Sequence, residues 1–214
     1  MIPVLGFAVY SQFHKADRLL ESIDYPVKHL VIVDNSGLQT WEPKKPELVE
    51  HFFVLRVPYG LGLVGAWNLI IKSTPYAPYW VLINDDAWFE RGSLEIIARE
   101  ADPEALNFVN IIPLWSCLVF GEGAIAKAGL YDERFYPLYY DDNDLHRRMI
   151  KAEVKENHID AKIHHENSSS MSGKNDENNR TFAANQKLHN KKVAEEDFSP
   201  GYWDLEIRRA NRWD

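Results

Sequence analysis

The 214-residue chain has a single cysteine, Cys117, so no disulfide can form within one copy of it. A chain without disulfides is typical of a reducing compartment. The N-terminal residues also lack the basic stretch of a secretory signal, and their apolar run is too short for a signal peptide or a membrane span. We therefore expect a cytoplasmic protein with no membrane span.

Positive charge is also scarce. The chain has 24 lysine and arginine residues against 32 aspartate and glutamate residues, which gives a formal net charge of −8. An acidic surface repels phosphate backbones and lacks the usual signature of a nucleic-acid-binding protein, although it does not exclude a local basic patch. Acidic clusters also repel a nucleotide diphosphate unless a metal ion lies between them, so such a substrate implies a divalent cation.

Apolar residues make up 45% of the chain, which suits one ordinary globular domain. The predicted strands are residues 4–10, 29–33, 52–57, 79–83, 107–112 and 117–120, with an edge strand over 159–163. The predicted helices lie around 16–23, 64–71, 93–100 and 141–152. We expect Ser93 to cap the third of these helices. The alternation of strands and helices predicts an α/β fold with a central, mostly parallel sheet flanked by helices.

The composition changes after about residue 166. Residues 167–179 are almost all serine, asparagine, glycine and charged residues, so we expect a mobile loop there. A short closing helix is predicted over 202–207. We therefore divide the chain into a main domain, 1–166, and a polar loop with a C-terminal tail, 167–214.

Three short polar clusters carry the candidate chemistry: Asn84-Asp85-Asp86, Asp141-Asp142-Asn143-Asp144 and His164-His165. Asn84-Asp85-Asp86 follows a predicted strand, as do Tyr10 and Asp34. Ligands of parallel sheets bind beyond the carboxyl ends of the strands. We therefore expect these residues to form one site with a divalent cation and a general base.

Each cluster also has a purely structural explanation, as a turn, a helix start or a structural histidine. In the functional interpretation Asp86 is a hard oxygen ligand for Mg²⁺ or Mn²⁺, and neutral His165 suits Mn²⁺ better than Mg²⁺. Because side chains alternate along an extended segment, Asn84 and Asp86 should share a direction while Asp85 points away.

A competing motif is Gly60-Leu61-Gly62-Leu63-Val64-Gly65, which matches G-x-G-x-x-G, with Asp85 following Gly65 by 20 residues. This dinucleotide-binding pattern favours an NAD-dependent oxidoreductase as the alternative. Two predicted strands precede the unit, however, and Pro58-Tyr59 separates its strand from the first glycine. The alternative also leaves the cluster at 141–144 and His165 unexplained. The glycines permit tight turns without any ligand as well.

Five segments, taken in order, resemble the inverting family 2 glycosyltransferases of the GT-A fold. They are the strand and loop at 31–36, the G-x-x-x-A-x-N segment at 62–68, the D-x-D region at 82–87, the segment at 129–135 that resembles G-x-F-D-E-x-F, and the segment at 140–148 that resembles E-D-x-D-L-x-x-R. The likeness covers roughly Val4 to Ser170. It implies a Rossmann-like GT-A fold of the nucleotide-diphospho-sugar transferases. Two departures are Asn84 in the first D-x-D position and Ser11 where an asparagine often follows the tyrosine.

The resemblance implies transfer of a sugar from a UDP-, GDP- or dTDP-linked donor to an acceptor hydroxyl, with Mn²⁺ or Mg²⁺ as cofactor. It makes Asp142 the catalytic base and Asp86 and His165 the metal ligands. The implied donor-binding residues are Tyr10, Ser11, Asp34, Ser36, Gly62, Asn68, Asn84 and Asp85, and those for the sugar or acceptor are Trp115, Tyr140 and Asp141.

The acceptor implied in this way is a glycan, a protein, a lipid-linked sugar or a modified nucleic-acid base. The tail at 167–214 is expected to pack on or near the acceptor side. A protein that binds a sugar nucleotide or a glycan without catalysis remains a further alternative.

Overall fold

The computed structural model describes residues 1–38, 40–109, 115–166, 175–201, 207 and 210. Its centre is a seven-stranded sheet with the strand order β3-β2-β1-β4-β7-β6-β8. Strand β7 runs antiparallel to both of its neighbours, and the other pairs are parallel. The strands are β1 (Ile2–Val9), β2 (Val27–Asp34), β3 (Val49–Arg56), β4 (Tyr79–Ile83), β6 (Ala105–Val109), β7 (Cys117–Gly121) and β8 (Lys155–Ile159). The prediction of an α/β fold with a mostly parallel sheet is confirmed.

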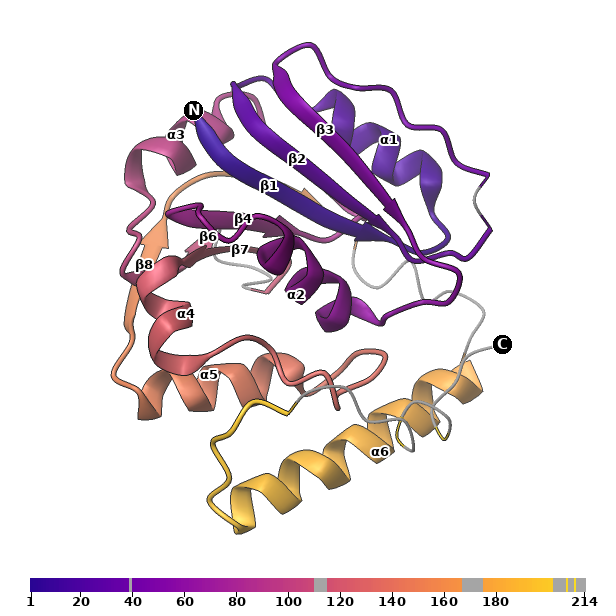
Figure 1. Cartoon of the computed structure of the whole chain (residues 1–214), viewed down its shortest axis with the longest axis vertical. Helices are drawn as coiled ribbons and strands as arrows, with labels where there is room; N and C mark the ends of the chain where they lie inside the picture. The colour runs from indigo at the N-terminus through magenta and orange to yellow at the C-terminus, as the bar shows by residue number, and fades with distance from the viewer. Residues whose placement is uncertain (39, 110–114, 167–174, 202–206, 208–209, 211–214) are drawn as a thin grey trace.

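Helices cover both faces of this sheet (Figure 1). Helices α1 (Phe13–Glu21) and α3 (Ser93–Glu100) pack on one face, and α2 (Leu63–Ser73), α4 (Glu122–Ala128) and α5 (Asp141–Lys151) pack on the other. Side chains alternate along the central strands, so Ile32 joins the core under α1 while Val31 and Val33 join the core under α2. Burial on both faces explains why these strands are continuous apolar runs.

A small second sheet pairs β5 (Ala87–Phe89) with β9 (Ile163–His165) in antiparallel orientation. The sequence predicted one edge strand over 159–163, but β8 ends at Ile159 and His165 lies inside β9. The Lys162 carbonyl accepts hydrogen bonds from the Glu90 amide (3.0 Å) and from Ser93 Oγ (2.7 Å), which directs the chain away from the main sheet. Ser93 is therefore not the cap of α3, and Gly92 occupies that position.

Helix α6 (Asn175–Ala194) occupies a region whose first residues were predicted to be loop. It lies beside α5 (Figure 1) and buries three polar side chains, Thr181, Asn185 and Lys192. Specific polar contacts, rather than an apolar stripe, hold this helix in place. The rest of the predicted loop (167–174) and most of the predicted closing helix (202–206) lie outside the described residues. In the described part of the chain, no helix combines the length and apolar character needed to span a membrane.

Candidate functional site

A cavity of about 220 Å³ lies at the carboxyl ends of β1 and β4, where the sequence predicted a ligand site. We call it the strand-end cavity. Its lining includes Tyr10, Asn35, Gly60, Gly62, Asn84, Asp85, Asp86, Tyr136, Pro137, Leu138 and His165. The predicted site residues Tyr10, Gly62, Asp86 and His165 therefore meet at one place, together with Asn84 and Asp85.

Strand β4 ends at Ile83, and the chain turns at once, with the Ala87 amide donating to the Asn84 carbonyl (3.2 Å). Because this segment is a turn and not an extension of the strand, Asn84, Asp85 and Asp86 all line the cavity. The alternation expected along an extended segment therefore does not apply to this turn.

Asp86 and His165 are in direct contact in the wall of this cavity. Asp86 Oδ1 lies 2.9 Å from His165 Nε2, and the two side chains are 5% and 11% exposed. The pairing of β5 with β9 produces this geometry, since Ala87 is opposite His165. The neighbouring His164 stacks on Trp88 instead (5.3 Å), so His165 is the histidine that reaches the cavity.

These residues fit a divalent cation that is shared with a substrate. Among the described residues no group of three or more histidine, cysteine, aspartate or glutamate side chains gathers as a ready metal site. Two buried atoms of the lining, Asn84 Oδ1 and His165 Nδ1, have no hydrogen-bond partner. Neighbouring ligands of an octahedral ion lie on the order of 3 Å apart, close to the Asp86–His165 separation. Such an ion takes its remaining ligands from phosphate oxygens and water.

The glycine motif shapes the wall of the strand-end cavity. Gly62 has φ of 77°, and a Cβ there would lie 2.9 Å from the Pro137 carbonyl oxygen. Asn35 fixes the loop, because its Nδ2 donates to the Gly62 carbonyl (3.0 Å) and its Oδ1 accepts from the Leu61 amide (2.8 Å). The motif follows β3, which is an edge strand, whereas the dinucleotide fingerprint follows the first strand of its sheet half. The glycines thus have a structural explanation that needs no NAD.

A second cavity of about 550 Å³ adjoins the first and shares Leu63, Asn84, Leu138 and His165 with it. We call it the aromatic cavity, and its wall also includes Trp67, Trp115, Ser116, Tyr131, Tyr139, Tyr140, Asp141, Asp142, Asn143 and Phe182. The predicted base Asp142 and the predicted acceptor residues Trp115, Tyr140 and Asp141 therefore lie next to the strand-end cavity.

The turn before α5, which leads into these acids, has an unusual backbone conformation. Tyr139 (φ 78°) and Tyr140 (φ 63°) are consecutive non-glycine residues in the left-handed region. This conformation costs on the order of 1 kcal/mol or more per residue, so neighbouring contacts must hold it. Asn185 of α6 does so, since its Nδ2 donates to the carbonyls of Leu138 (2.7 Å) and Tyr139 (3.2 Å).

The three acids that open α5 have different environments. Burial, followed by the charge of Asp142, raises the pKa of Asp141 to about 7. Asp144 is fully buried and pairs with Arg148 (2.8 Å) and Lys192 (2.8 Å), so its role is structural. Asp142 is more exposed than the other two, and it lines the aromatic cavity together with Asp141.

Four predicted donor residues do not line either cavity. Asp34 accepts hydrogen bonds from the Ser36 amide (3.0 Å) and from Ser36 Oγ (2.6 Å), and Ser11 is exposed. Asn68 Nδ2 donates to the Tyr131 carbonyl (3.0 Å) and its Oδ1 accepts from the Tyr131 amide (3.1 Å). Asn35 lines the strand-end cavity instead, and its place in the predicted turn after β2 was the available signal.

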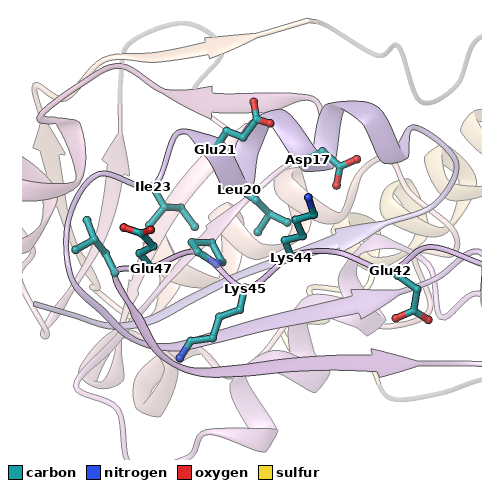
Figure 2. A pocket seen from close by; sticks show the side chains of 10 residues that line it. Asp17, Leu20, Glu21, Ile23, Glu42, Lys44, Lys45 and Glu47 are labelled. Atoms are coloured by element: carbon teal, nitrogen blue, oxygen red, sulfur yellow. The ribbon is translucent and has the colours of Figure 1, made fainter.

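A third hollow, of about 530 Å³, lies between α1 and the segment at 42–48 (Figure 2). Its lining combines the acids Asp17, Glu21, Glu42 and Glu47 with Lys44 and Lys45. Asp17 is engaged by Trp41 Nε1 (3.0 Å). None of the residues in the three sequence clusters lines this hollow, so we place the functional site at the strand ends.

No protein family model matches the chain, and no curated protein matches it. Solved structures do match it. The structure of S. aureus TarS 1–349 in complex with UDP-GlcNAc is 12% identical, with a TM-score of 0.62 over 99% of this chain and 70% of that one. GalNAc-T7 with UDP, GalNAc and Mn²⁺ is 9% identical, with a TM-score of 0.60 over 99% of this chain and 54% of that one.

The catalytic domain of Drosophila β1,4-galactosyltransferase 7 in complex with xylobiose is 8% identical, with a TM-score of 0.55 over 79% of this chain and 72% of that one. The chain spans 42% of a longer S. aureus TarS structure. These structural neighbours are GT-A glycosyltransferases, and the present chain has the GT-A fold. The fold predicted from the motifs is therefore confirmed.

Proposed function

We propose that this protein is a metal-dependent, inverting glycosyltransferase of the family 2 type, which moves a sugar from a nucleotide-diphosphate donor to an acceptor hydroxyl. One observation carries the proposal: the cavity of Asp86 and His165 adjoins the cavity of Asp142, with Asn84 and His165 in both walls. The UDP-GlcNAc bound to TarS and the UDP and Mn²⁺ bound to GalNAc-T7 support a UDP-linked donor and a manganese ion.

The strand-end cavity is the donor site in this proposal. Tyr10, Asn35 and the Gly62 loop bind the nucleoside and its diphosphate. Asp86 and His165, with Asn84 beside them, would hold Mn²⁺ or Mg²⁺. When bound, such a cation supplies positive charge that stabilises the departing diphosphate.

The residues at the start of α5 manage the proton in this reaction. Asp142 accepts the proton of the acceptor hydroxyl while that oxygen bonds to the anomeric carbon and the bond from this carbon to the phosphate oxygen breaks. Attack from the face opposite the diphosphate inverts the anomeric centre. Asp141, whose pKa is raised to about 7, is partly protonated near neutral pH; in its protonated form it donates a hydrogen bond to a substrate oxygen and adds no negative charge beside the base.

The substitution Asp142→Asn tests this assignment. It should reduce turnover by a factor on the order of 10² to 10⁴, the usual contribution of a positioned base, and leave binding of nucleotide and metal unchanged. Asp160→Asn, at an exposed position outside both cavities, is the matched control. An Asp142→Asn enzyme with full activity would remove Asp142 from the role.

A thermal-shift panel of UDP, GDP, dTDP and NAD, each with and without Mn²⁺, separates the function classes. A ligand at about 100 times its Kd adds about 2.7 kcal/mol to the free energy of unfolding. Metal-dependent stabilisation by a nucleoside diphosphate supports the transferase. Stabilisation by NAD without metal supports the oxidoreductase, and donor binding without transfer or hydrolysis supports a binding protein.

A further inference from the structure

The wall of the aromatic cavity presents rings from distant parts of the chain. Phe182 of α6 is 45% exposed and lies 5.5 Å from the Tyr139 ring and 5.1 Å from the Tyr140 ring. Trp115 packs against the His146 ring, with the two ring centroids 5.7 Å apart. Rings fixed by such contacts form rigid apolar surfaces that lose little freedom when a ligand binds.

The polar part of this wall is acidic or neutral. Asp141, Asp142, Asn84 and Asn143 line it, and no lysine or arginine does so within the part of the chain that the structure describes. The basic side chains that are close in the sequence or the fold have other partners. Arg148 and Lys192 pair with the buried Asp144, and the guanidinium of Arg147 lies over the Phe198 ring.

The wall also contains a hydrogen-bond donor without a protein acceptor. Trp67 is 2% exposed, and its Nε1 has no hydrogen-bond partner. A buried donor of this kind is normally satisfied by an ordered water or by a ligand oxygen. The cavity thus offers apolar faces, acceptors of hydrogen bonds and a buried donor, and its described lining has no lysine or arginine to balance an anion.

The inference drawn from these observations concerns the class of acceptor, and it rests on the proposed function. We propose that the aromatic cavity binds an uncharged saccharide, whose C–H face lies on Phe182 and Trp115 and whose hydroxyls bond to the acids and amides. A phosphate group there would face the Asp142 carboxylate, and no lysine or arginine among the described residues lines the wall to balance its charge, so it would be repelled. The acceptor is therefore a neutral glycan and not a phosphate-bearing polymer, a lipid diphosphate or a nucleic acid.

The experiment compares the transfer rates of matched acceptors. The donor is the nucleotide sugar whose nucleotide stabilises the protein in the thermal-shift panel. Maltose, lactose, cellobiose and N-acetylchitobiose are tested against glucose 6-phosphate, ribitol phosphate, a single-stranded oligonucleotide and a serine- and threonine-rich peptide. We expect transfer to at least one neutral saccharide, with kcat/KM at least about tenfold above that of every phosphate-bearing compound. Transfer mainly to a phosphate-bearing acceptor or to the peptide would overturn the inference.

Phe182→Ala tests the wall itself, with Phe53→Ala as control because Phe53 is similarly exposed (47%) and lies on β3 away from this cavity. Phe182→Ala should raise the saccharide KM about tenfold, with kcat and the nucleotide thermal shift unchanged, and Phe182→Tyr should restore the KM. An unchanged KM in Phe182→Ala would exclude Phe182 from the acceptor site.

Saccharide binding is also measured directly, by saturation-transfer NMR with the nucleotide and Mn²⁺ present. We expect saturation transfer from the wild-type protein to the ring protons of the saccharide, and weaker transfer from Phe182→Ala. If nucleotide binding and slow donor hydrolysis persist but no saccharide shows either transfer or NMR contact, the acceptor inference fails and the proposed function stands. If no nucleotide binds, the proposed function fails and the inference fails with it.

Discussion

At the scale of single residues, three aspartates within one turn of helix acquire three different properties. Asp144 is neutralised by buried cations, Asp141 is buried with a raised pKa, and Asp142 is accessible. The resemblance of the motif to a glycosyltransferase segment predicts Asp142 as the base. The burial that changes Asp141 depends on contacts from the rest of the fold, which the local sequence does not encode.

Asp141→Asn should change how stability depends on pH. The pKa of Asp141 is raised to about 7 by burial and by Asp142, so the folded chain binds this proton more tightly than the unfolded chain does. Stability is therefore lost as the pH rises from about 4 to about 7, and the loss is complete above that range. A shift of about three pKa units corresponds to about 4 kcal/mol, so the uncharged variant should be more stable than wild type by up to roughly 4 kcal/mol at about pH 8, with no gain at about pH 4.

Thermal unfolding across this pH range measures the effect, and Asp160→Asn at an exposed site is the control. A stability difference between wild type and Asp141→Asn that does not vary with pH would contradict the assigned shift.

His165→Ala should remove the manganese-dependent part of the UDP thermal shift. His165 lines the strand-end cavity beside Asp86, whereas His164 stacks on Trp88. His164→Ala is therefore a control from the same strand. We expect manganese affinity, measured by electron paramagnetic resonance with UDP present, to fall about tenfold or more in His165→Ala. Equal losses in the two variants would argue against His165 as a specific ligand.

At the scale of elements, α6 is the main addition that the structure makes. Lys192 is 1% exposed and reaches both Asp132 (2.5 Å) and Asp144 (2.8 Å). Burial raises the pKa of Asp132, but the hydrogen bonds from Arg134 and Lys192 outweigh this effect and hold it below its usual range. A buried cation thus fastens α6 to the helix that carries the proposed base.

Lys192→Met should lower the free energy of unfolding by roughly 3 kcal/mol or more, because it leaves two buried carboxylates without this partner. Lys191→Met at the adjacent exposed position should stay within about 0.5 kcal/mol of wild type. Denaturant unfolding of both variants measures the difference. A small loss for Lys192→Met would mean that the pair is not buried in solution.

Prediction from sequence succeeded for elements with a strong apolar pattern and failed for the others. Strand β4 begins and ends where its apolar run does, at Tyr79 and Ile83. Strand β8 has mostly exposed polar side chains, and β5 has three residues, so neither gives a periodic signal. Helix α6 was predicted as loop in its first residues because its polar composition resembles that of a disordered segment.

At the scale of the molecule, the ordered motifs anticipated the GT-A fold, and the cavity that Asp86 lines adjoins the cavity that Asp142 lines. The motifs did not anticipate that Asn35 replaces Asp34 in the cavity lining, or that Phe182 arrives from α6. Both depend on how loops and helices fold back on the sheet, and one chain read alone carries no record of such contacts. The aromatic cavity is therefore the part of the site that required the structure.

The net charge of the chain predicts an unusual salt dependence. A net charge of −8 repels an anionic nucleotide. Salt screens this repulsion, and the screening length falls to about 10 Å at about 0.1 M. Raising NaCl from about 0.02 to about 0.2 M should therefore strengthen metal-free UDP binding by about twofold, as measured by calorimetry. A basic phosphate site would show the opposite trend, and that result would contradict an acidic donor site that depends on metal.

Lys192 follows Asp132 by 60 residues, and it also neutralises Asp144 in the helix that presents Asp142. During synthesis the acids of α5 are made before Lys192, so a nascent chain contains this helix before the lysine that stabilises it. The protein should thus reach its folded state late in its own synthesis. Fragments released before residue 192 would keep two buried carboxylates without this counter-charge, and cellular proteases should clear them.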